Sequence, residues 1–359
     1  MKIFTHSFTV LALLVAATNG LDLVTQNDVT QESQASQVGQ ANPVQQSGAS
    51  QAADSSPKQS GHVQEDSCTL TGNYIQGTNV SHCETIVIDS LSVPAGVTLD
   101  LTNLWGGPLL KLKGTSLSVT GPGTLDGQGV WYWPQGQKVT KPVFFKLNRV
   151  SNSTLSGFTI KNSPFRTFSI GNSNYTTLTR LTLNSTAGNG VAKNTDGFDL
   201  SRNDHITITG NKIFNQDDCL AMQCSTNTLF SRNYCSGGHG ISIGSLGGDK
   251  VDDSDTVTGL LVKDNTIVNS DNGIRIKTIT GLTGLVKDIA YLNNKVVNVE
   301  NAIGLQQNQG RTQGLSGSAM SLYDIVANPD AVSNWSFTKI VVNATNRGNC
   351  TGEPITVKC

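Results

Sequence analysis

The sequence predicts an all-β fold in which short strands stack as the coils of a β-solenoid. Short β-branched runs alternate with turns rich in Asn, Gly, Ser and Asp, and the 37 glycines suit many turns rather than long helices. Six aliphatic runs, each followed by an asparagine-containing turn, recur at steps of 23, 25, 23, 32 and 28 residues. Their marker residues are Phe158, Leu181, Ile206, Leu229, Leu261 and Ile289. A period in the twenties built from strands and turns is what stacked coils require.

The alternative all-β fold is a β-sandwich. Its strands would recur about every 8 to 12 residues, without a longer period. An asparagine also follows the first strand of six coils, and a stacked asparagine can hydrogen-bond its neighbours and tolerate left-handed backbone. We expect a structural ladder, without chemistry, from Asn162, Asn184, Asn211, Asn233, Asn265 and Asn294.

Residues 1–20 have the features of a secretory signal peptide. Lys2 precedes an apolar run from Phe8 to Ala17, and small residues follow as cleavage sites. The alternative, a membrane anchor, is disfavoured because this run is short for a bilayer span. No later segment is long and apolar enough to cross a membrane, so we expect a secreted, extracellular and soluble protein.

Residues 21–67 form a region of low complexity. Within it, residues 26–65 contain ten Gln and seven Ser, and neither an aromatic residue nor Leu or Ile. Such a stretch buries too little apolar surface to offset the entropy lost on ordering. We expect a disordered tail or a removed propeptide here, followed by one folded domain at residues 68–359.

Seven cysteines follow the signal segment, and in an exported protein they are expected to form disulfides. Their spacing favours local loops, and the expected pairs are Cys68–Cys83, Cys219–Cys235 and Cys350–Cys359. Cys224 is then left unpaired. Metal binding is the alternative, but the CxxC pairs and accompanying histidines of zinc sites are missing. Sequons for N-glycosylation, which also fit export, occur at Asn79, Asn152, Asn174, Asn184, Asn334, Asn343 and Asn349.

The overall charge excludes one class of partner. A net charge of −1, with only 14% charged residues, lacks the basic field that nucleic-acid binding requires. It gives no support for binding to an anionic membrane surface either. Nucleic acid and membrane are therefore not expected partners.

Three carboxylates lie in two short acidic motifs, Asn194-Thr-Asp196-Gly-Phe-Asp199 and Asn215-Gln-Asp217-Asp218-Cys219. Asp196 and Asp217 are 21 residues apart, and His239 of a Gly-Gly-His-Gly motif follows after another 22. Residues one coil apart stack in a solenoid, so these side chains are expected to meet on one face. The segment Arg275-Ile-Lys277 then adds two cations at strand spacing on the same face.

This cluster indicates hydrolysis of a sugar acid. An isolated Asp-Asp pair is more often a solvated turn or a calcium ligand, and an isolated Gly-His-Gly is a weaker signal still. Stacked carboxylates, however, would repel one another without a functional reason. Glycoside hydrolysis needs one carboxyl group protonated to donate to the leaving oxygen and another ionised as nucleophile or water activator. Mutual repulsion is a means of splitting their pKa values. The two cations could pair with a carboxylate on the substrate.

Four segments resemble, in order and spacing, the signature blocks of glycoside hydrolase family 28, the polygalacturonases. They are NTDGFD, NQDDC, SGGHGISIGS and DNGIRIKT. The likeness covers most of residues 68–359, including the stretch from Gly121 to Gly129, Trp131, Trp133 and Asn162-Ser-Pro164. It implies a right-handed parallel β-helix with the active cleft along one sheet. It also implies a catalytic domain at 68–359 that hydrolyses α-1,4-galacturonosyl bonds of de-esterified pectin, in an endo-acting manner.

The resemblance implies a role for each acid. Asp217 would be the general acid that protonates the glycosidic oxygen, and His239 would tune its protonation. Asp196 and Asp218 would together activate water from the opposite face, which gives inversion. Carboxyl groups about 6.5 to 9.5 Å apart leave room for that water, whereas about 5 to 5.5 Å predicts retention.

The substrate-binding residues follow from the same resemblance. Arg275 and Lys277 would hold the galacturonate carboxylate, and Asn194 and Gln216 would orient the aspartates and the sugar. Where many family members have a substrate-contacting tyrosine, this chain has Asn301. A cysteine pair of the family is also absent, with Val332 before Ser333-Asn-Trp335.

Other functions remain as alternatives. A pectate lyase would need calcium-binding acids and a base that abstracts the C5 proton. A rhamnogalacturonan-acting relative, an exo-polygalacturonase and a catalytically weak or inactive pectin-binding protein are the others. We expect a monomer that needs neither metal nor cofactor, with pectin as substrate and inhibitor proteins of the plant wall as a further class of partner.

Overall fold

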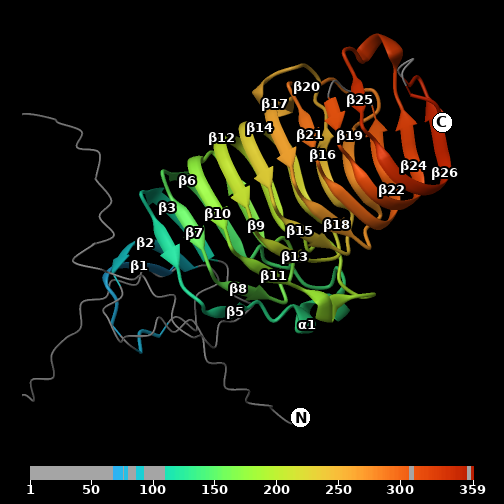
Figure 1. Ribbon diagram of the computed structural model, residues 1–359. Helices are drawn as coiled ribbons and strands as arrows, with labels where there is room; N and C mark the ends of the chain where they lie inside the picture. Colours follow the sequence, from blue (N-terminus) through green and yellow to red (C-terminus); the bar gives the residue numbers. More distant parts are fainter. Residues whose placement is uncertain (1–67, 76, 80–85, 93–109, 307–310, 354–356) are drawn as a thin grey trace, which may run out of the picture.

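The structure is a computed structural model that describes residues 68–75, 77–79, 86–92, 110–306, 311–353 and 357–359. The expected signal peptide and the low-complexity region, residues 1–67, lie outside the described residues. The regular structure of the described part is almost all β, with 26 strands joined by turns, and successive coils pair in parallel. The chain is a parallel β-helix, as the sequence predicts, with its coils stacked along one long axis from β1 to β26 (Figure 1).

The strands form three columns. Column 1 contains β1 (Cys68–Asn73), β2 (Ile86–Ser92), β3 (Leu110–Thr115), β6 (Phe145–Ser151), β9 (Phe168–Gly171), the first halves of β12 (Phe198–Thr209) and β14 (Asp218–Ser231), β16 (Gly240–Leu246), β19 (Asn272–Thr278), and the second halves of β22 (Lys295–Gln306), β24 (Ser316–Val326) and β26 (Val341–Thr351). Five long strands bend from one column into the next.

The other two columns are built from shorter strands. Column 2 contains β4 (Ser118–Thr120), β7 (Thr154–Ser156), β10 (Asn174–Thr179), the second halves of β12 and β14, β17 (Thr256–Lys263), β20 (Leu285–Lys287), β21 (Ala290–Leu292), β23 (Arg311–Gln313) and β25 (Ser336–Thr338). Column 3 contains β5 (Thr124–Asp126), β8 (Thr159–Lys161), β11 (Thr182–Asn184), β13 (Lys212–Phe214), β15 (Tyr234–Ser236), β18 (Thr266–Val268) and the first halves of β22, β24 and β26. Short helical turns are α1 (Gly129–Tyr132), η1 (Trp133–Gln135), η2 (Thr186–Gly188), η3 (Asp253–Asp255) and η4 (Pro329–Ala331).

Inward side chains of column 1 stack in register and form much of the core. The rings of Phe145, Phe168 and Phe198 stack with centroids 5.0 and 5.2 Å apart. The line continues through Leu220 and Ile241, both fully buried. Each such burial stabilises the fold by about 1.5–3 kcal/mol, so this line fixes which residues face each other across coils.

The predicted long period is confirmed, but the predicted markers are not all equivalent. The inward residues that pair in register in column 2 are Leu155, Leu178, Ile208, Phe230, Val262 and Tyr291, at steps of 23, 30, 22, 32 and 29. Ile206 instead pairs with Thr176, and Leu229 pairs with Thr207. Because the turns differ in length, no fixed step can give the register.

Four of the six predicted asparagines form a buried ladder. Each of Asn211, Asn233 and Asn265 donates from its side chain and from its backbone N–H to the side-chain oxygen of the next, ending at Asn294. The left-handed residue is the one before each asparagine, such as Arg232 or Asp264.

The prediction was wrong for Asn162 and Asn184. Leu181, not Asn184, donates its N–H to Asn211, so Asn184 lies three residues beyond the ladder position. Asn162 instead donates to both carboxylate oxygens of Asp126. The sequence period groups Asn162 and Asn184 with the ladder asparagines. The different lengths of the turns place them outside the ladder in the structure.

The expected features of an exported chain lie partly within the described residues. The structure joins Cys219 to Cys235 and Cys350 to Cys359, and leaves Cys224 buried and free. The expected Cys68–Cys83 bond includes Cys83, which lies outside the described residues. Sequon asparagines are exposed or half-buried: Asn79, Asn152, Asn334, Asn343 and Asn349 exposed, Asn174 and Asn184 half-buried. Among the described residues, no helix is long and apolar enough to cross a bilayer.

Replacing Asn233 by alanine should test the ladder. The change removes the acceptor of the N–H of buried Asn211 and one of the two acceptors of its side-chain NH2, which keeps its bond to the carbonyl of Leu178. Unmet buried groups cost about 1–3 kcal/mol, so we expect the free energy of unfolding to fall by about 3 kcal/mol in urea titrations. Asn346→Ala, at an exposed position of β26, is the matched control. Equal midpoints for the two variants would contradict a structural role for the ladder.

Candidate active site

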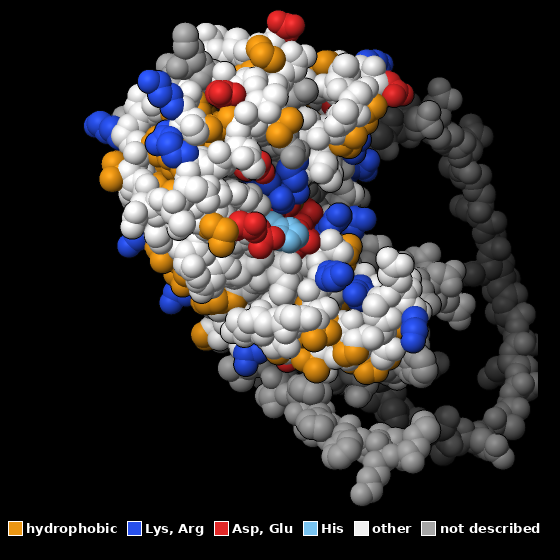
Figure 2. All heavy atoms as spheres, turned by 90° about the vertical axis from the view of Figure 1, so that its right-hand side faces the viewer, with side chains coloured by type: hydrophobic (Ala, Val, Ile, Leu, Met, Phe, Trp, Pro, Cys, Tyr) orange, Lys and Arg blue, Asp and Glu red, His pale blue; other side chains and the backbone are white. Residues whose placement is uncertain are grey.

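Charged side chains of both signs gather around a histidine in a hollow of one face of the molecule (Figure 2). Asp218 is the first residue of β14 and Asp217 directly precedes it, and Asp196 lies two residues before β12. Phe198 of β12 pairs with Leu220, which stacks the two acidic motifs. The backbone N–H of His239, just before β16, donates to the carbonyl of Asp217 at 3.0 Å. The coil spacing therefore brings the predicted residues to one edge of column 1.

Glycine is required on both sides of His239, because neighbouring backbone leaves no room for a Cβ atom. Gly238 has a φ of +69°, and a Cβ there would lie 2.1 Å from the carbonyl oxygen of Asp217. Gly240 has a φ of +87°, and its Cβ would lie 2.0 Å from the carbonyl oxygen of Asn272. Glycine tolerates this φ without steric cost, so the motif clamps His239 between two coils.

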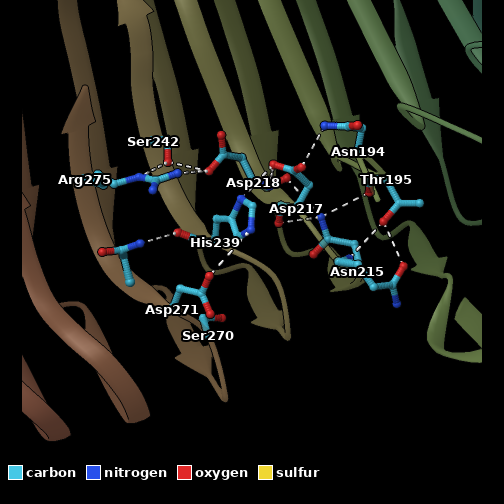
Figure 3. Close-up of polar contacts among 12 residues, drawn as sticks. Asn194, Thr195, Asn215, Asp217, Asp218, His239, Ser242, Ser270, Asp271 and Arg275 are labelled. Atoms are coloured by element: carbon cyan, nitrogen blue, oxygen red, sulfur yellow. Dashed lines mark hydrogen bonds and ion pairs between the residues drawn. The ribbon is translucent and has the colours of Figure 1, made fainter. Parts of the chain in front are cut away.

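Asp217 and His239 form an ion pair with 3.0 Å between Oδ1 and Nδ1 (Figure 3). The second carboxylate oxygen of Asp217 accepts from the side chain of Asn194 at 3.1 Å. Burial raises the pKa of Asp217, but the hydrogen bond and charge of His239 outweigh it, and the net pKa is lowered. The pKa of His239 is raised, chiefly by the bond to Asp217. At any pH between the pKa of Asp217 and the pKa of His239, the pair thus holds one proton, and that proton is on His239.

The other ring nitrogen of His239 faces a second carboxylate. Nε2 lies 3.5 Å from Oδ2 of Asp271, which is mostly exposed at 61% of its side chain. Asp271 lies just before β19, and its N–H donates to the carbonyl of Gly238. His239 is therefore flanked by acids from the coils on either side.

Asp218 is almost fully buried and is paired with both predicted cations. Arg275 Nη2 lies 3.0 Å from one carboxylate oxygen, and Lys277 Nζ lies 3.0 Å from the other. Ser242, one coil away, donates its hydroxyl to Asp218 at 2.5 Å and accepts from Arg275. Asp218 thus acts as the counter-ion of Arg275 and Lys277 in the protein without substrate.

Asp196 forms no ion pair with any residue that the structure describes. It is 6% exposed, and burial followed by the charges of Asp217 and Asp218 raises its pKa to about 7. Asp199, three residues on, forms a 3.3 Å pair with Arg166, and its pKa is raised by burial and by Asp196. The cluster therefore separates its carboxyl groups, with Asp217 favouring the charged form and Asp196 the neutral form.

Neighbouring amides fix the acidic turns. The side-chain nitrogen of Asn215 donates to the carbonyls of Thr195, Asp217 and Asp218. Gln216 accepts from the hydroxyl of Thr195 and donates to the turn at 185–189. Of the two predicted orienting residues, Asn194 contacts an aspartate carboxylate, whereas the contacts of Gln216 run to this turn.

A polar cavity of about 390 Å³ adjoins His239 on the side of Asp271. Ligand atoms of Asp217, Asp218 and His239 lie within 4.8 Å of one another, a spacing that could hold a metal ion. However, both oxygens of Asp218 contact cationic side chains, and these charges would repel a metal cation. We therefore assign no metal to the cluster.

Several site residues were not singled out from the sequence. Ser242 pairs in register with Arg275, but serine is too common for this to stand out without the register. Arg166 and Asp271 each lie in a turn rather than in a strand, where coil spacing gives no guide to side-chain placement. Asp271 is the first residue of the recognised segment DNGIRIKT, and its place in that segment was the available signal.

Comparison with known proteins decides the family. The model of Glycosyl hydrolases family 28 matches residues 109–356. The chain belongs to this family. Endopolygalacturonase I of Aspergillus aculeatus is 34% identical over 341 residues, which cover 82% of this chain and 89% of that protein. A polygalacturonase of Cochliobolus carbonum is 42% identical over 265 residues, covering 67% of this chain and 72% of that protein.

Solved structures support the fold of this family 28 chain. Endopolygalacturonase I from Stereum purpureum, solved with two galacturonates, matches with a TM-score of 0.55 at 24% identity, covering 80% of this chain and 91% of that one. Endo-xylogalacturonan hydrolase from Aspergillus tubingensis matches with a TM-score of 0.62 at 24% identity, covering 81% and 90%. At this identity the likeness concerns the β-helix alone.

Neutralising Asp271 should move the pH dependence of this family 28 protein. Asp271 contributes to the raised pKa of His239, and the proton on His239 is lost as pH rises through that value. Asp271→Asn should therefore shift the alkaline limb of the kcat/KM profile to lower pH, with the His239 ring signals in NMR titration moving alike. Asp330→Asn, at an exposed position far along the chain, is the control. An unmoved limb would show that Asp271 does not act on His239.

Proposed function

We propose that the protein is a secreted, endo-acting polygalacturonase that hydrolyses α-1,4-galacturonosyl bonds of de-esterified pectin with inversion. The observation that carries this proposal is the Asp217–His239 pair placed beside Asp196 and the Asp218–Arg275–Lys277 cluster. Such a set offers a proton donor, a charged base and a place for a substrate carboxylate. The names of relatives at 34–42% identity support the same substrate.

Asp217 is proposed as the general acid, with the proton coming from its pair with His239. In the free protein that proton resides on His239, and the pKa of Asp217 is lowered. A bound sugar would displace water from the pair, and loss of water disfavours two opposite charges relative to two neutral groups. The proton then moves to Asp217, which delivers it to the leaving glycosidic oxygen.

Asp218 and Asp196 are proposed to activate the attacking water. Asp218 is the charged member, since its ion pairs with Arg275 and Lys277 need the carboxylate. Asp196, with a pKa of about 7, holds a proton at mildly acidic pH. Asp196 then orients the water through hydrogen bonds while Asp218 accepts its proton.

Arg275 and Lys277 are proposed to bind the galacturonate carboxylate. Their side chains are 22% and 23% exposed, so each can contact a second anion while paired with Asp218. Asn194 would keep Asp217 oriented through the bond at 3.1 Å. Gln216 would support the turn below the acids rather than bind the sugar directly, because its side chain forms hydrogen bonds with Thr195, Ser185 and Asn189.

Export and partners complete the proposal. Two disulfides, exposed sequons and the signal-like residues 1–20 support an extracellular enzyme. Pectin is the proposed substrate, inhibitor proteins of the plant wall are a proposed partner class, and the enzyme is proposed to act as a monomer. Asn301 lies between Asn272 and Ser321 in column 1, so a polar amide replaces the family tyrosine beside the site.

The decisive test is release of reducing ends from polygalacturonic acid at mildly acidic pH. Asp217→Asn should lower kcat by about 10²–10⁴-fold, the usual contribution of a general acid, with KM little changed. Asp330→Asn should keep full activity. Oligomers of many lengths in the early digest are expected for endo action, whereas accumulation of one short product would indicate exo action. An inactive wild-type protein would favour the pectin-binding alternative, and activity lost in chelator would favour a lyase.

A further inference from the structure

We propose that the cavity beside His239 binds an uncharged sugar unit of the substrate chain. This position is separate from the carboxylate-binding position at Arg275 and Lys277. The inference rests on the proposed function, because it assumes that a galacturonan chain lies across the site.

The cavity is lined mainly by neutral groups that form hydrogen bonds. Its volume is about 390 Å³, and its polar walls include Thr186, Asn189, Gln216, Ser236 and Asn269. Neither lysine nor arginine is among its lining residues in the described part of the chain. Neutral amides and hydroxyls suit the hydroxyl groups of a sugar, whereas a carboxylate is normally met by a cation.

Two amides at the cavity have a side-chain atom without a partner in the described part of the chain, and they differ in burial: the Asn215 oxygen is enclosed by protein, whereas Asn269 lies at the cavity wall. Asn215 is buried, and its side-chain nitrogen donates to three carbonyls, yet its side-chain oxygen has no partner among the described residues. The side-chain oxygen of Asn269 accepts from Asn298. The structure gives the side-chain nitrogen of Asn269 no acceptor within the described part. The side-chain nitrogen of Asn269 is thus a donor available for a sugar hydroxyl.

The charge around His239 disfavours an anionic ligand in the cavity. Asp217 lies 3.0 Å from one ring nitrogen and Asp271 lies 3.5 Å from the other. Two carboxylates therefore surround a single imidazolium, which leaves this wall with an excess negative charge. Asp271 belongs to the cavity lining and is mostly exposed, so a sugar carboxylate would approach it directly. A free galacturonate would prefer Arg275 and Lys277.

Two kinds of sugar unit have the required chemistry. One is a galacturonate of the main chain whose carboxyl group is methyl-esterified. The other is a neutral sugar, such as xylose, attached to the main chain as a branch. Both present hydroxyl groups without charge, and the experiment below distinguishes them.

The test compares kcat/KM on three substrates at one mildly acidic pH. They are polygalacturonate, the same polymer with part of its carboxyl groups methyl-esterified, and xylose-substituted galacturonan. Asp271→Asn removes the charge that repels a sugar carboxylate. The ratio of kcat/KM on a substrate with uncharged units to kcat/KM on polygalacturonate should therefore fall about fivefold, because one exposed like charge has an effect of about this size. Taking the ratio of the kcat/KM values for two substrates removes any effect that the substitution has on both through His239. Asp330→Asn should leave every ratio unchanged.

The outcomes separate the inference from the proposed function. A ratio that changes only for the methyl-esterified polymer assigns the cavity to the main chain, and one that changes only for the xylose-substituted polymer assigns it to a branch. Unchanged ratios in both arms, with activity on polygalacturonate retained, would overturn the inference and leave the proposed function intact. Wild-type protein inactive on all three substrates would reject the proposed function and the inference with it.

Discussion

The structure depends on in-register stacking of parallel coils in column 1. Adjacent strands lie about 4.8 Å apart, so a side chain at one strand end has its nearest neighbours on the coils above and below. The stacked rings from Phe145 to Phe198 set this register inside the helix. The polar ladder from Asn211 to Asn294 holds the coils together at another corner. The arrangement of charged side chains on the surface of the β-helix therefore follows from the register that the core side chains fix.

Stacking at this spacing forces like charges together, and the site shows how each is accommodated. Asp218 is balanced by Arg275 and Lys277, and Asp217 by His239. Asp196 forms no ion pair within the described part of the chain, and its pKa rises to about 7. A carboxyl group with a raised pKa holds its proton more tightly in the folded state, so its contribution to stability falls as pH rises from about 4 towards 7. The His239 pair is likewise lost as pH rises through its raised pKa. Both effects make the folded protein more stable at acidic pH than at neutral pH.

The sequence predicted the fold and which acids lie close together, because both depend on repeated patterns. The acidic motifs and His239 recur at nearly one coil length, and the structure brings them together. The failures share one cause, which is the variable length of turns. Asn162 and Asn184 resemble ladder residues in sequence but lie off the ladder, and Leu181 occupies its place. Asp271 and Arg166 lie in turns, so their contacts with His239 and Asp199 could not be predicted from spacing. The pairing of Arg275 and Lys277 with Asp218 could not be predicted either, because the sequence indicated a substrate carboxylate as the partner of these two cations.

The central claim is that the three aspartates divide into one proton donor, Asp217, and two groups that direct water, Asp196 and Asp218. The most direct measurement is ¹H NMR of the anomeric signals during the first minutes of digestion of α-linked galacturonan. Attack by water opposite the leaving group inverts the anomeric centre, so new reducing ends should appear first in the β form and equilibrate later. Reducing ends that appear first in the α form would mean that a carboxylate attacks the sugar itself, which would contradict this division of roles.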